Sequence, residues 1–170
     1  MRITGGRYKG LKISSKVGAG VRPTASRVRE AIFSIIGQDL TGKSFLDAFG
    51  GSGLMGIEAY SRGASATIYE KNNAAFRNIV QTIKKGQMHI TVERGCAGRA
   101  LKKKWNIIFM DPPYALDPKP WLNMAQGKFT DALIYEHAAK AILPDKIGQS
   151  FRVKHKKYGD CALSIFHCDT

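Results

Sequence analysis

The chain has 170 residues, 44% of them hydrophobic, and its 27 Lys and Arg outnumber 13 Asp and Glu to give a formal net charge of +14. This length predicts one globular domain with a sizeable core, and the charge predicts a polyanionic partner rather than an acidic surface. No stretch approaches the ~18 apolar residues of a membrane helix, and no N-terminal segment resembles a signal peptide. These features speak against membrane and secreted proteins, so we expect a cytoplasmic protein with no membrane association.

The first 34 residues carry eight Lys and Arg against a single acid, so half of the net charge falls on a fifth of the chain. Two short strands are expected within residues 2–13, followed by a Gly, Ser and Lys loop over residues 14–21. The apolar residues that come next repeat at helical spacing and predict a helix, with Arg27 and Arg29 off its apolar stripe. We expect this segment to face the polyanion.

Residues 45–53 read Phe-Leu-Asp-Ala-Phe-Gly-Gly-Ser-Gly, which predicts a strand that runs into a glycine-rich turn, and residues 54–59 predict the helix that follows. Such a turn aims the backbone N–H groups of the helix start at a bound ligand. A carboxylate at the strand end, Asp47, would repel a pyrophosphate but attract the ammonium of a methionine-like group. The motif therefore favours S-adenosylmethionine (SAM) over NAD. The alternative is a buried Asp47 that caps the next helix.

A second acidic residue, Glu70, ends the next predicted strand, residues 65–70, about twenty residues past the glycines. This is where a carboxylate binds ribose hydroxyls in nucleotide-binding folds. Because the carboxyl ends of parallel strands meet at one edge of a sheet, we expect Glu70 and Asp47 to face the same ligand.

The rest of the chain alternates predicted strands and helices and then ends in a hairpin. The expected elements are a helix after Asn72 or Asn73 with apolar residues up to 83, a strand at 88–92, a helix at 97–104, a strand at 106–110, a helix at 121–125, a strand at 132–136, a helix through 142, and strands at 150–157 and 161–167. This order predicts an α/β sheet with an antiparallel edge. We expect one domain over residues 1–170, with 1–22 as a basic extension and 23–170 as the catalytic core.

Asp111-Pro112-Pro113-Tyr114 follows the apolar strand at 106–110. A structural turn explains the prolines better than it explains the tyrosine. The chemical reading is amino methylation, because the Asp111 carboxylate and a nearby carbonyl can accept the N–H groups of a base amine and aim its lone pair at a methyl donor. Tyr114 would stack on the base, which must be unpaired or flipped out to reach this rim.

Several segments, in this order along the chain, resemble the RsmD-type 16S rRNA guanine-N2 methyltransferases. They are Arg-Pro-Thr at 22–24, Arg-Val-Arg-Glu-Ala-Ile-Phe at 27–33, the glycine turn at 47–53, Gly-Ile-Glu-Ala at 56–59, Ser-Arg-Gly-Ala at 61–64, Asp-Pro-Pro-Tyr at 111–114 and Lys-Tyr-Gly-Asp at 157–160. The resemblance implies a class I, Rossmann-like methyltransferase fold with a mostly parallel seven-stranded sheet, an antiparallel C-terminal hairpin and a short N-terminal hairpin. It also implies SAM as cofactor and 16S rRNA as partner, bound by a monomer within a small-subunit particle.

The same resemblance and the charge imply the site residues. Those expected at the reaction centre are Asp111, Pro112, Pro113 and Tyr114. Those expected to bind the cofactor are Asp47, Phe49, Gly51, Ser52, Gly53, Glu70, Lys71, Cys96 and Ala97. Those expected to bind RNA are Arg7, Lys9, Arg22, Thr24, Arg27 and Arg29. No metal is expected, because Cys161, Cys168, His155 and His167 match no compact metal-binding spacing.

One position departs from the family pattern. Members usually carry an acid after the strand that is predicted to end near Val92, where this chain has Gly95-Cys96-Ala97, and a cysteine is a weak acceptor. Two alternatives stay open beside the rRNA methyltransferase: a DNA amino methyltransferase, which shares Asp-Pro-Pro-Tyr, and a basic RNA-binding assembly factor with a decayed methyltransferase site. An NAD enzyme is disfavoured by Asp47.

Overall fold

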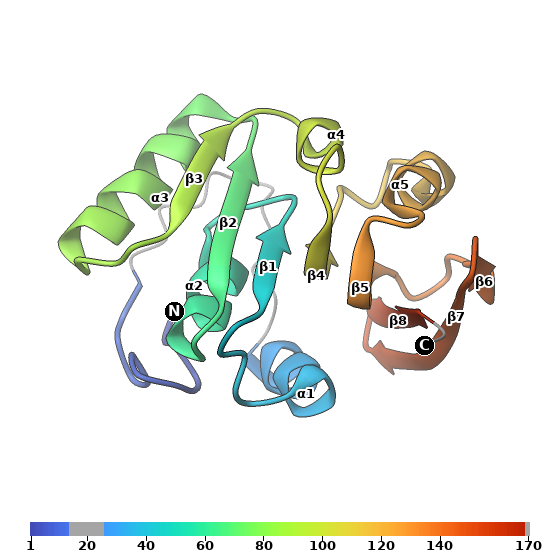
Figure 1. Ribbon diagram of the computed structural model, residues 1–170, viewed down its shortest axis with the longest axis horizontal. Coiled ribbons are helices and arrows are strands. Elements are labelled where there is room, and N and C mark those ends of the chain that lie inside the picture. Colours follow the sequence, from blue (N-terminus) through green and yellow to red (C-terminus); the bar gives the residue numbers. More distant parts are fainter. Residues whose placement is uncertain (14–25, 169–170) are drawn as a thin grey trace.

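The structure is a computed structural model that describes residues 1–13 and 26–168 (Figure 1). A sheet of eight strands crosses the described residues in the order β3-β2-β1-β4-β5-β8-β7-β6. The strands are β1 (Ser44–Asp47), β2 (Ser65–Glu70), β3 (Thr91–Arg94), β4 (Trp105–Met110), β5 (Phe129–Ala138), β6 (Lys146–Ile147), β7 (Ser150–Tyr158) and β8 (Cys161–Cys168). The helices are α1 (Ser26–Ile36), α2 (Leu54–Ser61), α3 (Asn73–Lys85), α4 (Ala97–Ala100) and α5 (Pro118–Ala125).

Strands β1 to β5 run parallel, whereas β8 joins β5 antiparallel and β7 and β6 continue in alternating directions. The predicted parallel sheet with an antiparallel C-terminal hairpin is thereby confirmed, and the two-residue β6 is an addition to it. Strand β4 is apolar and buried from Ile107 to Met110, as a parallel strand covered on both faces must be.

Helices cover both faces of the sheet (Figure 1). Apolar residues of α1 and α2, among them Ile32 and Met55, pack on one face against β1, β4, β5 and β8. Helix α3 joins them on that face through Ile79, which packs with Ile68 of β2. On the other face α4 and α5 contribute Ala100 and Leu122. This two-sided cover leaves the carboxyl ends of the parallel strands as the edge where a ligand can bind.

The N-terminal segment folds back on itself, although only Arg2 and Lys12 form a bridge pair where two strands were predicted. Its arms are joined by hydrogen bonds such as that from the Ile13 N–H to the Met1 carbonyl (2.8 Å). Ile3 and Ile13 are buried in the cluster that contains residues of α2 and α3. The predicted N-terminal extension therefore contributes to the core as well as to the surface.

Three further element predictions are corrected. The strand expected at 88–92 lies at Thr91–Arg94, because Met88 and Ile90 pack into the core before the ladder begins. The helix expected at 97–104 ends at Ala100. The helix expected through 142 is absent from the described residues, since β5 continues to Ala138 in pairing with β8, and this tertiary pairing overrides the helix propensity of the alanine-rich segment. No helix in the described part of the chain is long and apolar enough to cross a membrane.

Candidate active site

The glycine-rich turn links β1 to α2 as predicted. Gly53 is the N-cap of α2 with φ of 75°, a left-handed conformation that glycine adopts without strain. Gly56 lets α2 approach the sheet, because a Cβ at this position would stand 2.4 Å from Cγ1 of Ile68. The turn itself is held by the Gly50 N–H, which donates to the Tyr69 carbonyl (2.7 Å).

Asp47 lies buried beneath this turn. Its Oδ2 accepts a hydrogen bond from the Gly56 N–H (3.1 Å) in the first turn of α2. This oxygen therefore caps the helix, as the alternative interpretation of Asp47 predicted. Among residues 1–13 and 26–168, no group donates a hydrogen bond to its Oδ1. Burial, with a smaller contribution from the charge of Glu70, raises the pKa of Asp47 to about 7. A buried carboxylate oxygen that lacks a hydrogen-bond donor is suited to bind the ammonium of a ligand. The positive charge would form an ion pair with Asp47 and would lower its pKa, so that the carboxyl group ionises.

Glu70 receives two backbone donors. Its Oε2 accepts from the Gly51 N–H (2.7 Å) and its Oε1 from the Asn72 N–H (2.6 Å). The carboxylate therefore fixes the glycine turn and the start of α3, where Asn72 is the N-cap. A carboxylate can accept further hydrogen bonds, so this arrangement is compatible with ribose hydroxyls.

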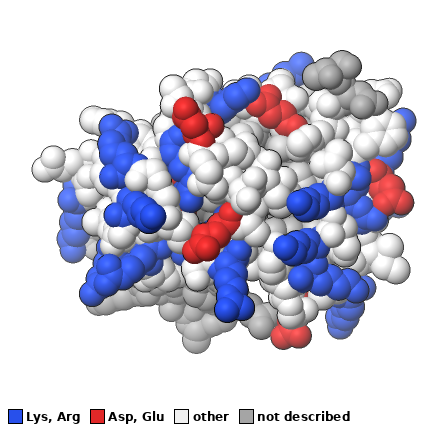
Figure 2. Space-filling model, turned by 90° about the horizontal axis from the view of Figure 1, so that it is seen from below, with Lys and Arg blue, Asp and Glu red and all other residues white. Residues whose placement is uncertain are grey.

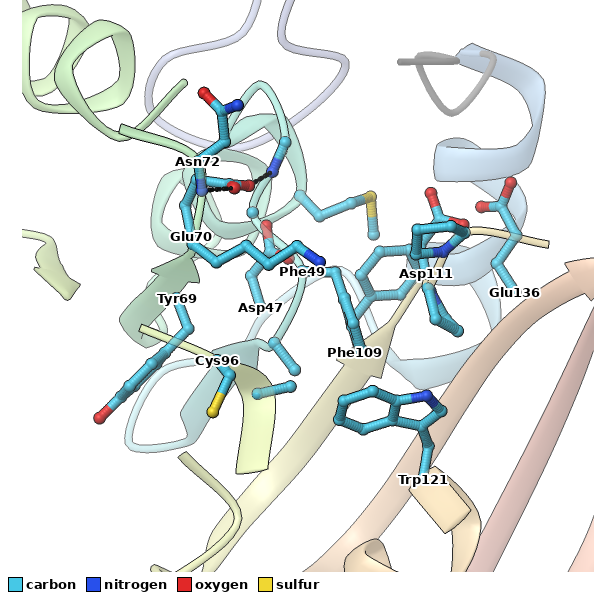
Figure 3. Close-up of a pocket in the computed structure, with 18 of the residues that line it drawn as sticks. Asp47, Phe49, Tyr69, Glu70, Asn72, Cys96, Phe109, Asp111, Trp121 and Glu136 are labelled. Atoms are coloured by element: carbon cyan, nitrogen blue, oxygen red, sulfur yellow. Dashed lines mark hydrogen bonds between the residues drawn. The ribbon is translucent and has the colours of Figure 1, made fainter. Parts of the chain in front are cut away.

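A cavity of about 610 Å³ opens along the carboxyl ends of β1, β2 and β4 (Figure 3). Figure 3 shows Glu70 toward one end of it and Asp111 with Glu136 toward the other. Of the residues predicted to act at the reaction centre or on the cofactor, all but Gly53 line this cavity. They are Asp47, Phe49, Gly51, Ser52, Glu70, Lys71, Cys96, Ala97, Asp111, Pro112, Pro113 and Tyr114.

Apolar side chains form the cavity wall between these polar ends. Phe49 meets Trp121 of α5 edge to face, with ring centroids 5.0 Å apart, and both line the cavity. Cys96 also lines it, immediately before the short helix α4. The cavity thus offers an apolar slot for a flat heterocycle, with Cys96 where an acidic residue was expected from the family pattern.

Asp111 leaves the end of β4 and shares its end of the cavity with Tyr114, which is 39% exposed. Burial, followed by the charges of Glu136 and Asp47, raises the pKa of Asp111 to about 8. The negative charges of Glu136 and Asp47 therefore disfavour the ionised form of Asp111. A ligand that brings hydrogen-bond donors or positive charge to this end would relieve their repulsion.

Glu136, like Trp121, lines the cavity but was not predicted from the sequence as a site residue. It is buried on β5 and accepts a hydrogen bond from the Tyr114 hydroxyl (3.3 Å). Its position could have indicated a site residue, because Glu136 lies near the carboxyl end of a strand parallel to β4. The same kind of position identified Asp111. The Glu136 side chain orients Tyr114 and places a second negative charge beside Asp111.

Of the residues predicted to bind RNA, some are exposed at the surface as expected and one is buried. Arg7, Lys9 and Arg27 are exposed, whereas Arg22 and Thr24 lie outside the described residues. Arg29 is a correction, because it is only 2% exposed and pairs with Glu58 of α2 (3.4 Å).

Glu58 is fully buried and sits at the centre of an ion cluster. Arg62 pairs with it from the end of α2, and Arg29 pairs with it from α1. Thr4 of the N-terminal segment donates to it through its backbone N–H (2.7 Å) and its hydroxyl (3.1 Å). The cluster therefore ties the N-terminal segment to α2, the helix that begins at the cavity, and gives Arg29 a structural role.

Comparisons with known proteins find relatives over nearly the whole chain. Residues 1–167 match the model of the family described as "Conserved hypothetical protein 95". The chain is 37% identical to Ribosomal RNA small subunit methyltransferase D of Buchnera aphidicola (subsp. Acyrthosiphon pisum) over 184 residues, covering 99% of this chain and 93% of the relative. It is 31% identical to YlbH of Bacillus subtilis, covering 98% of each. The solved structure of yhhF from Escherichia coli superposes with a TM-score of 0.86 at 28% identity, covering 99% of this chain and 98% of that one.

Proposed function

Because the chain belongs to the RsmD-type rRNA methyltransferase family, we propose that it methylates the exocyclic N2 amine of a guanine in 16S rRNA with SAM as donor. The observation that carries this proposal is the cavity that joins Asp47 and Glu70 at one end to Asp111 and Tyr114 at the other. One end has the groups that a sulfonium amino acid and a ribose require, and the other has acceptors for an amine.

The residues present fit SAM. Asp47 would pair with its ammonium through Oδ1, Glu70 would accept its ribose hydroxyls, and the wall formed by Phe49 and Trp121 would enclose apolar parts of the ligand. Bound SAM supplies an electrophilic methyl group. The backbone around Cys96 and the packing of this wall would hold the adenine in place of the missing acid.

Asp111 prepares the nucleophile. The lone pair of an exocyclic amine is delocalised into the base, so the amine reacts poorly until its N–H groups are drawn toward acceptors. The Asp111 carboxylate and a carbonyl of Asp111-Pro112-Pro113 accept these N–H groups and turn the lone pair toward the methyl donor. Tyr114, held by Glu136, stacks on the base that enters through the open end of the cavity.

The polyanionic partner of this basic chain is 16S rRNA, which the exposed Arg7, Lys9 and Arg27 approach through its phosphates. The substrate is a small-subunit particle in the cytoplasm, in which the target base is unpaired or can be flipped out. The protein acts as a monomer, with residues 1–170 as one methyltransferase domain.

Glu70→Ala should weaken SAM binding by about 1.5–3 kcal/mol, the range for hydrogen bonds to charged groups. The loss arises because the ribose acceptor disappears and the Gly51 N–H loses its partner. Isothermal calorimetry measures it, with Glu30→Ala on the exposed face of α1 as the control that should bind normally. Equal affinity in wild type and Glu70→Ala would remove Glu70 from the cofactor site, and no SAM binding by the wild type would refute the proposed activity.

Methyl transfer should rise with pH as Asp111 loses its proton, because the ionised carboxylate is the stronger acceptor for the amine and burial with acidic neighbours raises its pKa to about 8. Glu136→Gln removes a repelling charge and so lowers the pKa of Asp111, which moves the rise to lower pH. The pH profile of single-turnover transfer at saturating SAM checks this. Asp39→Asn, a change in the loop between α1 and β1, should leave the profile in place. Superimposable profiles for wild type and Glu136→Gln would contradict the coupling.

The substrate class is tested by transfer of tritiated methyl groups from SAM to small-subunit particles, naked 16S rRNA and duplex DNA. We expect label in RNA and none in DNA. Label in duplex DNA would favour the DNA amino methyltransferase, which shares Asp-Pro-Pro-Tyr. Tight RNA binding without label in any substrate would favour the assembly factor with a decayed site.

A further inference from the structure

Strand β7 carries a row of basic and aromatic side chains on one face. The row consists of Phe151, Lys154, Lys156 and Tyr158, whose partners on β8 are His167, Ile165, Leu163 and Cys161. A register shift between Arg152 and Lys154 marks a β-bulge, and this extra residue re-aims the strand. Without it, both lysines would face away from the side on which Phe151 lies.

The β7 row is open to solvent. Phe151 is 43% exposed, both lysines are exposed and Tyr158 is half-buried. The Lys156 ammonium lies 5.3 Å from the centroid of the Tyr158 ring, and the ammonium of Lys146 on β6 lies 4.8 Å from that of Phe151. Cations interleaved with aromatic rings are the surface composition that binds single-stranded nucleic acid, since the rings stack on bases while the cations meet phosphates.

The Lys156 end of the β7 row lies beside the cavity, whereas Phe151 lies toward the amino end of β5, level with Ala132. Glu136, which lines the cavity, is paired with Leu163 of β8, and Leu163 is paired with Lys156 of β7. Directly paired residues point to the same face of a sheet, so Glu136 and Lys156 share a face two strands apart, roughly 10 Å. Figure 2 shows several Lys and Arg side chains on the right-hand side of the molecule, the side where β7 and β8 stand in Figure 1.

We propose that the β7 row binds the single-stranded RNA that adjoins the target nucleotide, with its lysines on phosphates and Phe151 against a base. The proposal rests on the proposed function for the identity of the RNA. Lys154 and Lys156 stand two residues apart on a strand, roughly 6.6 Å, which is comparable to the separation of neighbouring phosphates in an extended strand. The N-terminal cations and the β7 row would then hold the RNA at two separate places.

The other explanation for lysines on this strand is protection of a sheet edge. Strand β6 pairs with β7 at Ser150 and Phe151, and no other strand in the described part of the chain pairs with that edge of β7. Lysines on such an edge deter pairing with another chain. Edge protection accounts for the lysines. It does not account for a large aromatic side chain exposed on the same face, which would promote association rather than prevent it.

The test compares two double variants that remove equal charge. Lys154→Gln with Lys156→Gln alters the β7 row, whereas Lys103→Gln with Lys104→Gln alters exposed lysines just before β4, at the opposite end of the sheet from Asp111. The probe is a fluorescent oligouridylate, and binding is measured without SAM over a range of salt. Two lost phosphate contacts should reduce affinity roughly 25-fold at 0.1 M salt and lower the log–log salt slope by about 1.4. Phe151→Ser should reduce affinity about fivefold or more.

The control variant should bind nearly as the wild type does, and all variants should keep the wild-type melting temperature and SAM affinity. Equal losses in the two double variants would overturn the proposal in favour of diffuse charge. Unchanged RNA affinity together with self-association of the Lys154→Gln, Lys156→Gln variant would overturn it in favour of edge protection. RNA binding is measured without SAM and does not depend on catalysis. The binding result can therefore be interpreted even if the protein shows no methyltransferase activity.

Discussion

Asp111→Ala should reduce methyl transfer by roughly 10³-fold, because removal of one preorganised group at a reaction centre costs about 10²–10³ in rate and the amine also loses a charged acceptor. Asp111→Asn retains an acceptor oxygen but no charge, so it should keep a small residual rate. The measurement is single-turnover transfer to small-subunit particles at saturating SAM.

The same variants provide their own control. Asp111 lies at the far end of the cavity from Glu70, so neither replacement should weaken SAM binding much (Figure 3). Wild-type turnover by Asp111→Ala would exclude the acceptor mechanism, and loss of both SAM binding and turnover would indicate a structural role instead.

Glu58→Gln should destabilise the fold by about 3–5 kcal/mol, because it leaves Arg29 and Arg62 buried beside a neutral side chain. That is a large fraction of the 5–15 kcal/mol typical of a domain. Urea unfolding measures the change. The matched control is Asp131→Asn, which breaks the partly exposed surface pair with Lys43 and should cost about 0–1 kcal/mol.

Equal effects of Glu58→Gln and Asp131→Asn would mean that the buried cluster is no more important than a surface pair. If the expected difference is found, the result also explains why residues 1–13 should not simply be deleted to test RNA binding. Such a truncation removes Ile3, Ile13 and the donors of Thr4 together with the cations. Single changes at Arg7 or Lys9 leave that anchoring intact.

The ends of β1, β2 and β4 were predictable, and with them most of the site. Asp47, Glu70 and Asp111 were each recognised because an apolar strand stops at an acid, and parallel strands bring their carboxyl ends to one edge. The glycines between β1 and α2 were informative for a local reason, since a left-handed N-cap and a close helix–strand approach both require them.

What the sequence did not reveal depends on contacts between distant residues. Arg29 is buried because Glu58, 29 positions away, meets it in the folded protein, and the helical pattern of α1 contains no sign of that partner. Glu136 gains its importance from Tyr114 and Asp111 on a neighbouring strand and loop. The β7 row exists because of a bulge, and a single shifted residue cannot be recognised from alternation alone.

The central claim, guanine-N2 methylation of 16S rRNA, is tested most directly by the chemical identity of the product. Small-subunit particles that lack this modification are incubated with the protein and labelled SAM, and the RNA is digested to nucleosides and resolved against standards. The account predicts label in N2-methylguanosine at one position, and none with Asp111→Ala. Label in a methylated adenosine or cytidine, or no label in RNA from a protein that binds SAM, would contradict it.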